Sequence, residues 1–310
     1  MILIPFPEMI PLAAKIASHL GTVSRPLDWH HFPDGESLVT IPNGLSGEDV
    51  AIVATLRDPD TLALPLRFAA ATAREMGAHH VGLIAPYLGY MRQDHRFHAG
   101  QSVSAILFSD FLSESFEWLV TVDPHLHRIS SLGDVFRIPA KRVTTAPLLA
   151  EWISKNVPDG VLLGPDSESQ QWVGEVARLA DRPFEVLKKH RTGDRSVDVS
   201  MPKSAALRHG TPVILDDIAS SGQTMVRAIE QLLAAGTGQP ICLIIHGIFA
   251  GNALENLSSA GALRVVTTDT VPHPTNVIGV APLIAHAIRE IAPSATLGEG
   301  RRHANERKGE

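Results

Sequence analysis

Short aliphatic runs alternate with longer amphipathic stretches along the first half of the chain. The runs at 50–56, 80–90 and 118–125 have the length and composition of strands, whereas 61–78 and 102–115 have the length of helices. The first twenty residues add a further strand and helix. Such an alternation is typical of a parallel sheet covered by helices. We therefore predict an α/β fold.

The second half repeats this pattern after a polar junction at 138–145. The predicted helices are 148–156, 169–180, 222–236 and 281–292, and the predicted strands are 160–166, 184–189, 211–217 and 240–249. The chain thus divides into a domain at 1–142, a second at 143–295 and a polar tail at 296–310. The sequence does not decide which half the last helix packs against.

Composition and charge limit the classes of partner. With 310 residues, 44% apolar and 19% charged, the chain has the size and composition of a folded two-domain protein. The formal net charge of -6 provides no global basic field, so an anionic ligand must be held by local groups. We do not expect nucleic acid as a partner.

The single cysteine and the hydropathy indicate the compartment. Cys242 lies in the apolar run "PICLIIHGIF", where we expect a buried strand residue, and one cysteine forms no disulfide framework. No stretch reaches the roughly 20 uninterrupted apolar residues of a membrane span. We expect a soluble, cytoplasmic protein with no membrane partner.

The most informative motif is "VILDDIASSGQTM" at 213–225. An apolar strand ends in Asp216 and Asp217, and a small hydroxyl-rich loop leads into a helix. Backbone N–H groups at a helix N-terminus favour a phosphate, and carboxylates at a strand end can accept hydrogen bonds from sugar hydroxyls. The alternative is that the serines and Asp217 only cap the helix. The order of strand, acids, loop and helix favours phosphate and ribose binding.

Cations and acids elsewhere suggest sites for a nucleotide and a metal. Arg92 and Arg96 lie in a loop after a predicted strand and could clamp phosphates, or form ordinary surface ion pairs. His125 and His127 follow another strand, and their spacing alone is equally compatible with a structural role. The acids Asp166 and Asp217 favour Mg²⁺ over a zinc cage.

The loop at 213–225 resembles the phosphoribosyl pyrophosphate loop shared by type I phosphoribosyltransferases and ribose-phosphate pyrophosphokinases. Four further segments resemble the pyrophosphokinases in family order: "FPDGESLVTI" at 32–41, "APYLGYMRQDHRF" at 85–97, "VTVDPHLH" at 120–127 and "LLGPDSES" at 162–169. A basic stretch, "EVLKKHRTGDRSVDV", resembles the family's cationic flap. The alternative for this stretch is an exposed hairpin with solvated cations.

The resemblance implies two tandem type I phosphoribosyltransferase-like domains, each a mainly parallel sheet flanked by helices. It implies transfer of the β,γ-diphosphoryl group of ATP to the C1 hydroxyl of ribose 5-phosphate, giving 5-phosphoribosyl 1-pyrophosphate and AMP. It also implies a homo-oligomer, because the 32–41 segment in the family completes the adenine site of a neighbouring subunit.

The same resemblance assigns roles to individual residues. The implied ATP-binding residues are Phe32, Asp34, Glu36, Arg92, Gln93, Asp94, Arg96 and His125. The implied ribose-5-phosphate-binding residues are Asp216, Asp217, Ser220, Ser221, Gly222, Gln223 and Thr224. His125 and Asp166 are the implied metal-binding residues, and Lys189 and Arg191 the implied catalytic cations of the flap.

Some positions depart from the common family pattern. Ser220 stands where many members carry an acid and Gln223 where they carry glycine, which is closer to the archaeal-type branch. The residues after Asp166 lack the usual glycine-rich run. A non-catalytic regulatory paralogue, a phosphoribosyltransferase and a diphosphokinase for a related sugar phosphate therefore remain alternatives at this point.

Overall fold

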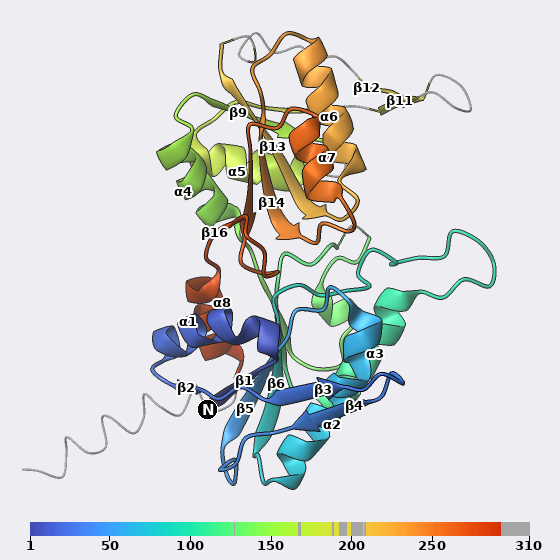
Figure 1. The fold of residues 1–310 in the computed structure, drawn as a ribbon, viewed down its shortest axis with the longest axis vertical. Coiled ribbons are helices and arrows are strands. Elements are labelled where there is room, and N and C mark those ends of the chain that lie inside the picture. The colour runs from blue at the N-terminus through green and yellow to red at the C-terminus, as the bar shows by residue number, and fades with distance from the viewer. Residues whose placement is uncertain are drawn as a thin grey trace, which may run out of the picture. The chain divides into compact units, whose positions relative to one another are not determined.

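The computed structural model describes residues 1–126, 128–166, 169–187, 207 and 209–292, with the backbone alone at 171, 189–191 and 197–199. The chain forms two compact units. The first consists of Met1–Val143 together with the segment that begins at Val280, and the second of Thr144–Gly279. Each unit is built on its own sheet (Figure 1).

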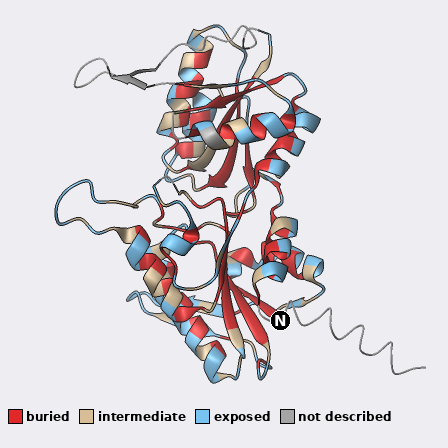
Figure 2. Ribbon diagram, turned by 180° about the vertical axis from the view of Figure 1, so that it is seen from behind, coloured by how far each residue is buried: buried red, intermediate tan, exposed pale blue. Residues whose placement is uncertain are grey.

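The first unit contains a six-stranded sheet in the order β2-β1-β5-β6-β7-β8. All neighbouring strands in it are parallel. The strands are β1 (Ile2–Pro5), β2 (Val23–Ser24), β5 (Asp49–Val53), β6 (His80–Ala85), β7 (Leu119–Val122) and β8 (Ala140–Val143). The residues of β5 and β7 are buried throughout, as expected for a parallel sheet covered on both faces (Figure 2).

Within the described residues of this unit, four α-helices and two short 3₁₀ helices accompany the sheet. They are η1 (Pro7–Met9), α1 (Ile10–Leu20), α2 (Pro59–Glu75), α3 (Ser104–Ser115), η2 (Leu132–Asp134) and α8 (Ala281–Ile291). Gly21 follows the last residue of α1 as its C-terminal cap, and its φ of 67° is the left-handed conformation that such a cap adopts. The buried apolar residues of α2 and α3 join the core around β5 and β6.

The last helix, α8, belongs to the first unit although it follows the whole second unit in sequence. It lies beside α1 (Figure 1), where Arg289 donates a hydrogen bond to the backbone carbonyl of His19. Lys141 in β8 forms an ion pair of 2.7 Å with Glu290. This differs from the predicted second domain, which ran to residue 295, because the apolar face of α8 is buried in the first unit.

The second unit repeats the architecture of the first. Its six strands are all parallel and lie in the order β10-β9-β13-β14-β15-β16. The strands are β9 (Gly160–Gly164), β10 (Phe184–Val186), β13 (Thr211–Ala219), β14 (Ile241–Gly247), β15 (Arg264–Thr268) and β16 (Asn276–Ile278). The helices are α4 (Ala146–Asn156), α5 (Gln170–Ala180), α6 (Gln223–Ala234) and α7 (Ala253–Ser259). The predicted fold class, two α/β units with parallel sheets, is confirmed.

Each unit also carries an antiparallel pair of strands outside its main sheet. In the first unit β3 (Asp28–His31) pairs with β4 (Ser37–Thr40), and in the second β11 (Lys189–Arg191) pairs with β12 (Val197–Val199). The predicted elements did not include the β3–β4 pair, whereas a hairpin was the alternative interpretation of the basic stretch that contains β11 and β12. Both pairs carry residues to which the family resemblance assigns a role.

Two further predictions concern Cys242 and membrane spans. Cys242 is fully buried in β14, as predicted. Burial is the larger cause, and the negative charge of Asp216 the smaller, of a rise in the pKa of its thiol to about 12. The thiol is therefore unreactive at neutral pH. Among the described helices, none combines the length and apolarity that crossing a membrane requires.

Candidate active site

In the second unit, the acids predicted from the sequence gather where the strand order reverses. β9 connects onward to β10 on one side of the sheet, and β13 connects to β14 on the other. Ligands of open α/β sheets bind in the crevice at the carboxyl ends of two such strands. Asp166 follows the end of β9, and Asp216 lies just beyond the last residue of β13 that pairs with β9.

The carboxylates at this crevice perturb one another. Asp216 keeps part of its surface exposed, but burial of its carboxyl group raises its pKa well above the ordinary value. The negative charges of Asp217 and Asp166 raise the pKa of Asp216 further, and the Asp217 backbone N–H donates to the Asp216 carboxylate at 3.0 Å. Such a concentration of acids suits a bound cation or the hydroxyl groups of a sugar.

The loop at 220–222 leads directly into α6. Gly222 is the N-cap residue and has a φ of 70°, a left-handed conformation that glycine adopts without a steric penalty. No side-chain hydrogen bond caps this helix end, so the structure does not support helix capping as the reason for the serines. The backbone N–H groups of the first turn of α6 are thus available for an anion.

The segment after β14 fixes the base of this loop. The N–H group of Phe249 donates to the backbone carbonyl of Ala219 at 2.9 Å, and the N–H group of Ala250 donates to the backbone carbonyl of Ser220 at 3.0 Å. Ser221 and Gln223 are exposed, whereas Ser220 and Thr224 are half-buried. The predicted ribose-5-phosphate residues therefore lie together, on a loop whose backbone is held by the neighbouring strand end.

In the first unit, the loop between β6 and α3, at 86–103, carries four of the implied ATP-binding residues, and we call it the nucleotide loop. Arg92 and Arg96 are exposed, and Gln93 and Asp94 are half-buried. The guanidinium of Arg96 donates to the Gln101 carbonyl at 2.9 Å. An open groove of about 440 Å³ lies on this loop. Its lining residues are Tyr90, Gln93, Gln101, Ser102 and Ser104.

Asp94 is engaged by protein groups. Its carboxylate accepts a hydrogen bond of 3.0 Å from the guanidinium of Arg128, and His95 Nδ1 lies 2.8 Å from the same oxygen. Burial acts to raise the pKa of Asp94, but the hydrogen bonds from His95 and Arg128 outweigh it, and the pKa is lowered. Asp94 as a whole residue is half-buried, but its side chain alone is only 2% exposed. Asp94 therefore ties the nucleotide loop to the segment after β7.

Replacing Asp94 with asparagine is expected to raise the KM for ATP about tenfold and to lower the free energy of unfolding by about 1–2 kcal/mol. The lowered pKa means that the native carboxylate stabilises the fold above the ordinary aspartate pKa of 3.8. That contribution disappears as the pH falls through the lowered native pKa. Thermal unfolding between pH 6 and pH 2 would detect a steeper loss in the wild type than in the variant.

A matched control for this prediction is Asp110→Asn. Asp110 also pairs with an arginine, Arg137, at 3.0 Å in the same unit, but both of these side chains are largely exposed. We expect a change of less than about 0.5 kcal/mol there. Equal losses in the two variants would contradict the anchoring role of Asp94.

The remaining predicted residues of the first unit lie at two places. His125 follows the end of β7 and is half-buried. Two residues earlier, Asp123 has a φ of 31°, and its carboxylate accepts a hydrogen bond of 3.2 Å from the guanidinium of Arg142. Phe32, Asp34 and Glu36 occupy the exposed tip of the β3–β4 hairpin.

Some of the predicted residues lie outside the described side chains, and one predicted pair is divided between the two units. Lys189 and Arg191 lie in β11, but their side chains are outside the described residues, as is all of His127. His125 and Asp166 belong to different units. A metal held by both stays a prediction.

Comparisons with known proteins identify the family. The model of the N-terminal domain of ribose phosphate pyrophosphokinase matches residues 1–115, and that of the phosphoribosyl transferase domain matches 142–284. A ribose-phosphate pyrophosphokinase of Methanopyrus kandleri is 31% identical over 294 residues, which cover 94% of this chain and 100% of the relative. The chain belongs to the ribose-phosphate pyrophosphokinase family.

Other members of the pyrophosphokinase family agree with this assignment. The ribose-phosphate pyrophosphokinase of Halobacterium salinarum is 32% identical over 89% of this chain and 96% of its own length. The crystal structure of the phosphoribosylpyrophosphate synthetase from Mycobacterium smegmatis shares the fold, with a TM-score of 0.79 and 24% identity over 94% of this chain and 98% of that one. The predicted family is confirmed.

Sequence reasoning missed several residues around the nucleotide loop of this family member. Tyr90, Gln101, Ser102 and Ser104 line the groove, and Arg128 anchors Asp94. The hydroxyl-rich run "QSVS" before α3 was a usable signal, because such residues gather at helix N-termini. Arg128 gave no such signal, since its partner lies 34 residues away in sequence.

Proposed function

We propose that this chain is a ribose-phosphate diphosphokinase that transfers the β,γ-diphosphoryl group of ATP to ribose 5-phosphate. The observation that carries the proposal is the uncapped N-terminus of α6 beside Asp166, Asp216 and Asp217, in a member of the pyrophosphokinase family. The loop offers N–H groups to the 5-phosphate, and the acids face the ring hydroxyls. The chain is an enzyme of this family.

The reaction needs positioning and positive charge more than a covalent intermediate. The C1 hydroxyl oxygen attacks the β-phosphorus of ATP, and the bond from that phosphorus to the oxygen bridging the α and β positions breaks. AMP leaves with the bridging oxygen, and the hydroxyl proton passes to solvent. Arg92 and Arg96 are exposed on the nucleotide loop and can bind phosphate oxygens, while Lys189 and Arg191 would stabilise the transferred group.

The donor set of the second unit fits magnesium. Burial, followed by the negative charges of Asp217 and Asp166, raises the pKa of Asp216, and a divalent cation nearby would relieve the repulsion between these charges. We propose that Asp166, with His125, faces an Mg²⁺ ion that is bound mainly through substrate phosphates. Bound magnesium would neutralise charge on the diphosphoryl group.

A shared active site between two copies of the chain is the second part of the proposal. Phe32 lies at the tip of the β3–β4 hairpin and is 37% exposed. Among the described aromatic contacts, its ring makes one, an edge-to-face contact with the His30 ring at a centroid distance of 4.4 Å. Asp34 and Glu36 are exposed beside it. An exposed aromatic residue with two acids suits the stacking and amino-group recognition of an adenine that belongs to a neighbouring copy.

Replacing Phe32 with alanine is therefore expected to raise the KM for ATP about tenfold, since stacking of a base on an aromatic ring contributes about 1–3 kcal/mol. The KM for ribose 5-phosphate and the melting temperature should not change, because the side chain is exposed. Leu38→Ala, which removes a 54% exposed apolar side chain from the same hairpin, is the control. Unaltered ATP kinetics in Phe32→Ala would exclude the adenine contact.

The test of the proposed reaction is an AMP-release assay with Mg-ATP, with and without ribose 5-phosphate. Sugar-dependent AMP formation supports the diphosphokinase. Release of ADP or inorganic phosphate in place of AMP overturns the scheme. Binding of ribose 5-phosphate without any turnover indicates the regulatory paralogue.

A further inference from the structure

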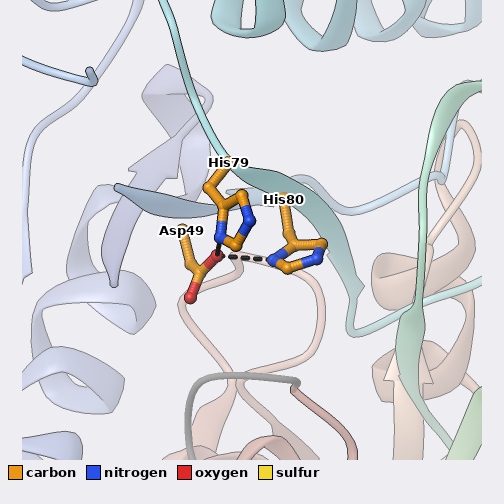
Figure 3. Close-up of side chains that lie close together, drawn as sticks. All are labelled: Asp49, His79 and His80. Carbon is orange, nitrogen blue, oxygen red and sulfur yellow. Dashed lines mark hydrogen bonds and ion pairs between the residues drawn. The ribbon is translucent and has the colours of Figure 1, made fainter. Parts of the chain in front are cut away.

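Two histidines and an aspartate converge at the amino ends of two neighbouring strands in the first unit. Asp49 is the first residue of β5 and His80 the first of β6, and the two are direct partners in the parallel register. His79 immediately precedes β6. One carboxylate oxygen of Asp49 lies 2.8 Å from His80 Nδ1 and 3.5 Å from His79 Nδ1 (Figure 3).

Both imidazole rings lie on the same side of the chain, which is unusual for adjacent residues near a strand. Within a strand, successive side chains point to opposite faces. His79 lies before the first residue of β6, so this alternation does not apply to it. The ring centroids of His79 and His80 are only 4.1 Å apart. Figure 3 shows the rings of His79 and His80 turned toward the carboxylate of Asp49.

The backbone around this cluster is held by hydrogen bonds. The His79 N–H donates to the Glu48 carbonyl at 2.7 Å, and the Gly47 N–H donates to the Gly77 carbonyl at 2.8 Å. The Asp49 side chain is 10% exposed, so rotation into solvent is limited. The three side chains are therefore positioned by the start of the sheet rather than by a free loop.

The neighbouring charged groups are engaged elsewhere. Glu48 pairs with the terminal amine at 3.5 Å, and Glu117 pairs with Arg74 at 2.7 Å. The Asp49 carboxylate is thus the acid that faces the two rings in this cluster. Two protonated imidazoles at this separation would repel each other, whereas one divalent cation can bind both neutral rings and the carboxylate together.

We propose that Asp49, His79 and His80 form a binding site for a divalent transition-metal ion of the Zn²⁺ class. Zinc binds histidine nitrogen and carboxylate oxygen at about 2.0–2.2 Å, which in a tetrahedron separates the ligand atoms by about 3.4 Å. The observed 2.8 and 3.5 Å lie on either side of this value, and all three ligand atoms lie within 4.8 Å of one another. Three ligands leave a fourth position for water.

The chemistry of this cluster differs from that of the proposed magnesium site. Imidazole nitrogens favour zinc, cobalt, nickel or copper, whereas Mg²⁺ favours oxygen ligands. The cluster also lies at the amino ends of the strands, while the nucleotide loop follows the carboxyl end of β6. A six-residue strand separates the two ends by roughly 20 Å. Metal in the cluster would join β5 to β6 without touching the proposed substrates.

The experiment measures binding of Zn²⁺ alone to the full chain after removal of metals with a chelator. We expect one tightly bound Zn²⁺ equivalent per chain, which survives dialysis against excess Mg²⁺. We also expect the zinc-bound protein to have a higher melting temperature than the metal-free protein. His79→Ala/His80→Ala should lose this equivalent, with at least a tenfold weaker affinity. Cobalt in place of zinc should give visible d–d absorption in the wild type that the variant lacks.

The matched control is His30→Ala/His31→Ala, which removes the adjacent pair of histidines in β3. This variant should still bind one Zn²⁺ equivalent. If the double variant at 79 and 80 does not fold, the single variant His79→Gln replaces it, because that side chain is 68% exposed and precedes the strand. Absence of a tight equivalent, its persistence in these variants, or its displacement by Mg²⁺ would overturn the proposal.

Discussion

Replacing Asp216 with asparagine is expected to lower the rate of AMP formation about 10²- to 10³-fold and, at the same time, to raise the melting temperature of the substrate-free protein. The two effects have one cause. Burial of the Asp216 carboxyl group, followed by the negative charges of Asp217 and Asp166, makes the ionised side chain costly to the fold. The proposed substrate and cation would offset this cost only when they are bound.

The direction of the stability change follows from the raised pKa of Asp216. Because the native pKa lies above the ordinary value of 3.8, the folded chain holds the proton more tightly than the unfolded chain. The group therefore reduces stability as the pH rises from the ordinary value through the native one. Each unit of elevation corresponds to about 1.4 kcal/mol. Asparagine has a similar shape and removes the ionisation.

The measurement is thermal unfolding in the presence of a chelator, from pH 5 to pH 8, beside the AMP assay. Asp216→Asn should melt higher than the wild type, with the difference growing as the pH rises. The control is Asp181→Asn, at an exposed position with a φ of 53°, where asparagine is well tolerated and neither property should change. A lower melting temperature for Asp216→Asn would show that the crevice acids do not repel one another in the free protein.

The sheets could be predicted from the sequence because their strands are nearly continuous apolar runs. β5, β9 and β14 are buried from end to end, so that hydrophobicity alone marks them. β15 and the β3–β4 hairpin were missed, since β15 begins with an exposed arginine and the hairpin is mostly exposed and polar. Such strands are determined by their neighbours in space.

The position of α8 could not be predicted for a similar reason. An apolar stripe shows that one face of a helix is buried but not against which partner. Here the decisive contacts join residues far apart in the chain, such as Lys141 with Glu290 and His19 with Arg289. The same limit applies to Asp94. The family resemblance assigns it a contact with ATP, but its partner Arg128 was not recognisable from the sequence.

The loop at 220–224 shows what structure adds to a motif. From the sequence, helix capping and phosphate binding were both compatible with serines after a strand. The structure places Gly222 at the N-cap and gives that helix end no side-chain cap, which removes the first interpretation. Phosphate binding by the backbone N–H groups of this loop stays a prediction.

Lys189→Ala is expected to reduce kcat for AMP formation about 10³-fold while leaving the KM for both substrates and the melting temperature nearly unchanged. The prediction rests on the spacing of Lys189 and Arg191 in β11, which matches the flap of the pyrophosphokinase family. A cation that meets the diphosphoryl group mainly in the transition state raises kcat without strengthening ground-state binding. Removal of such a cation typically costs about 10²- to 10⁵-fold.

The adjacent residues provide matched controls for this prediction. Lys188→Ala removes the same charge one position earlier, and His190→Ala changes the residue between the two flap cations. Both should retain kcat within about threefold, whereas Arg191→Ala should resemble Lys189→Ala. If Lys188→Ala and Lys189→Ala lose activity equally, the stretch contributes only a general positive field. Selective loss in Lys189→Ala and Arg191→Ala assigns the transition-state charge to these two residues, because net charge changes equally in the lysine variants.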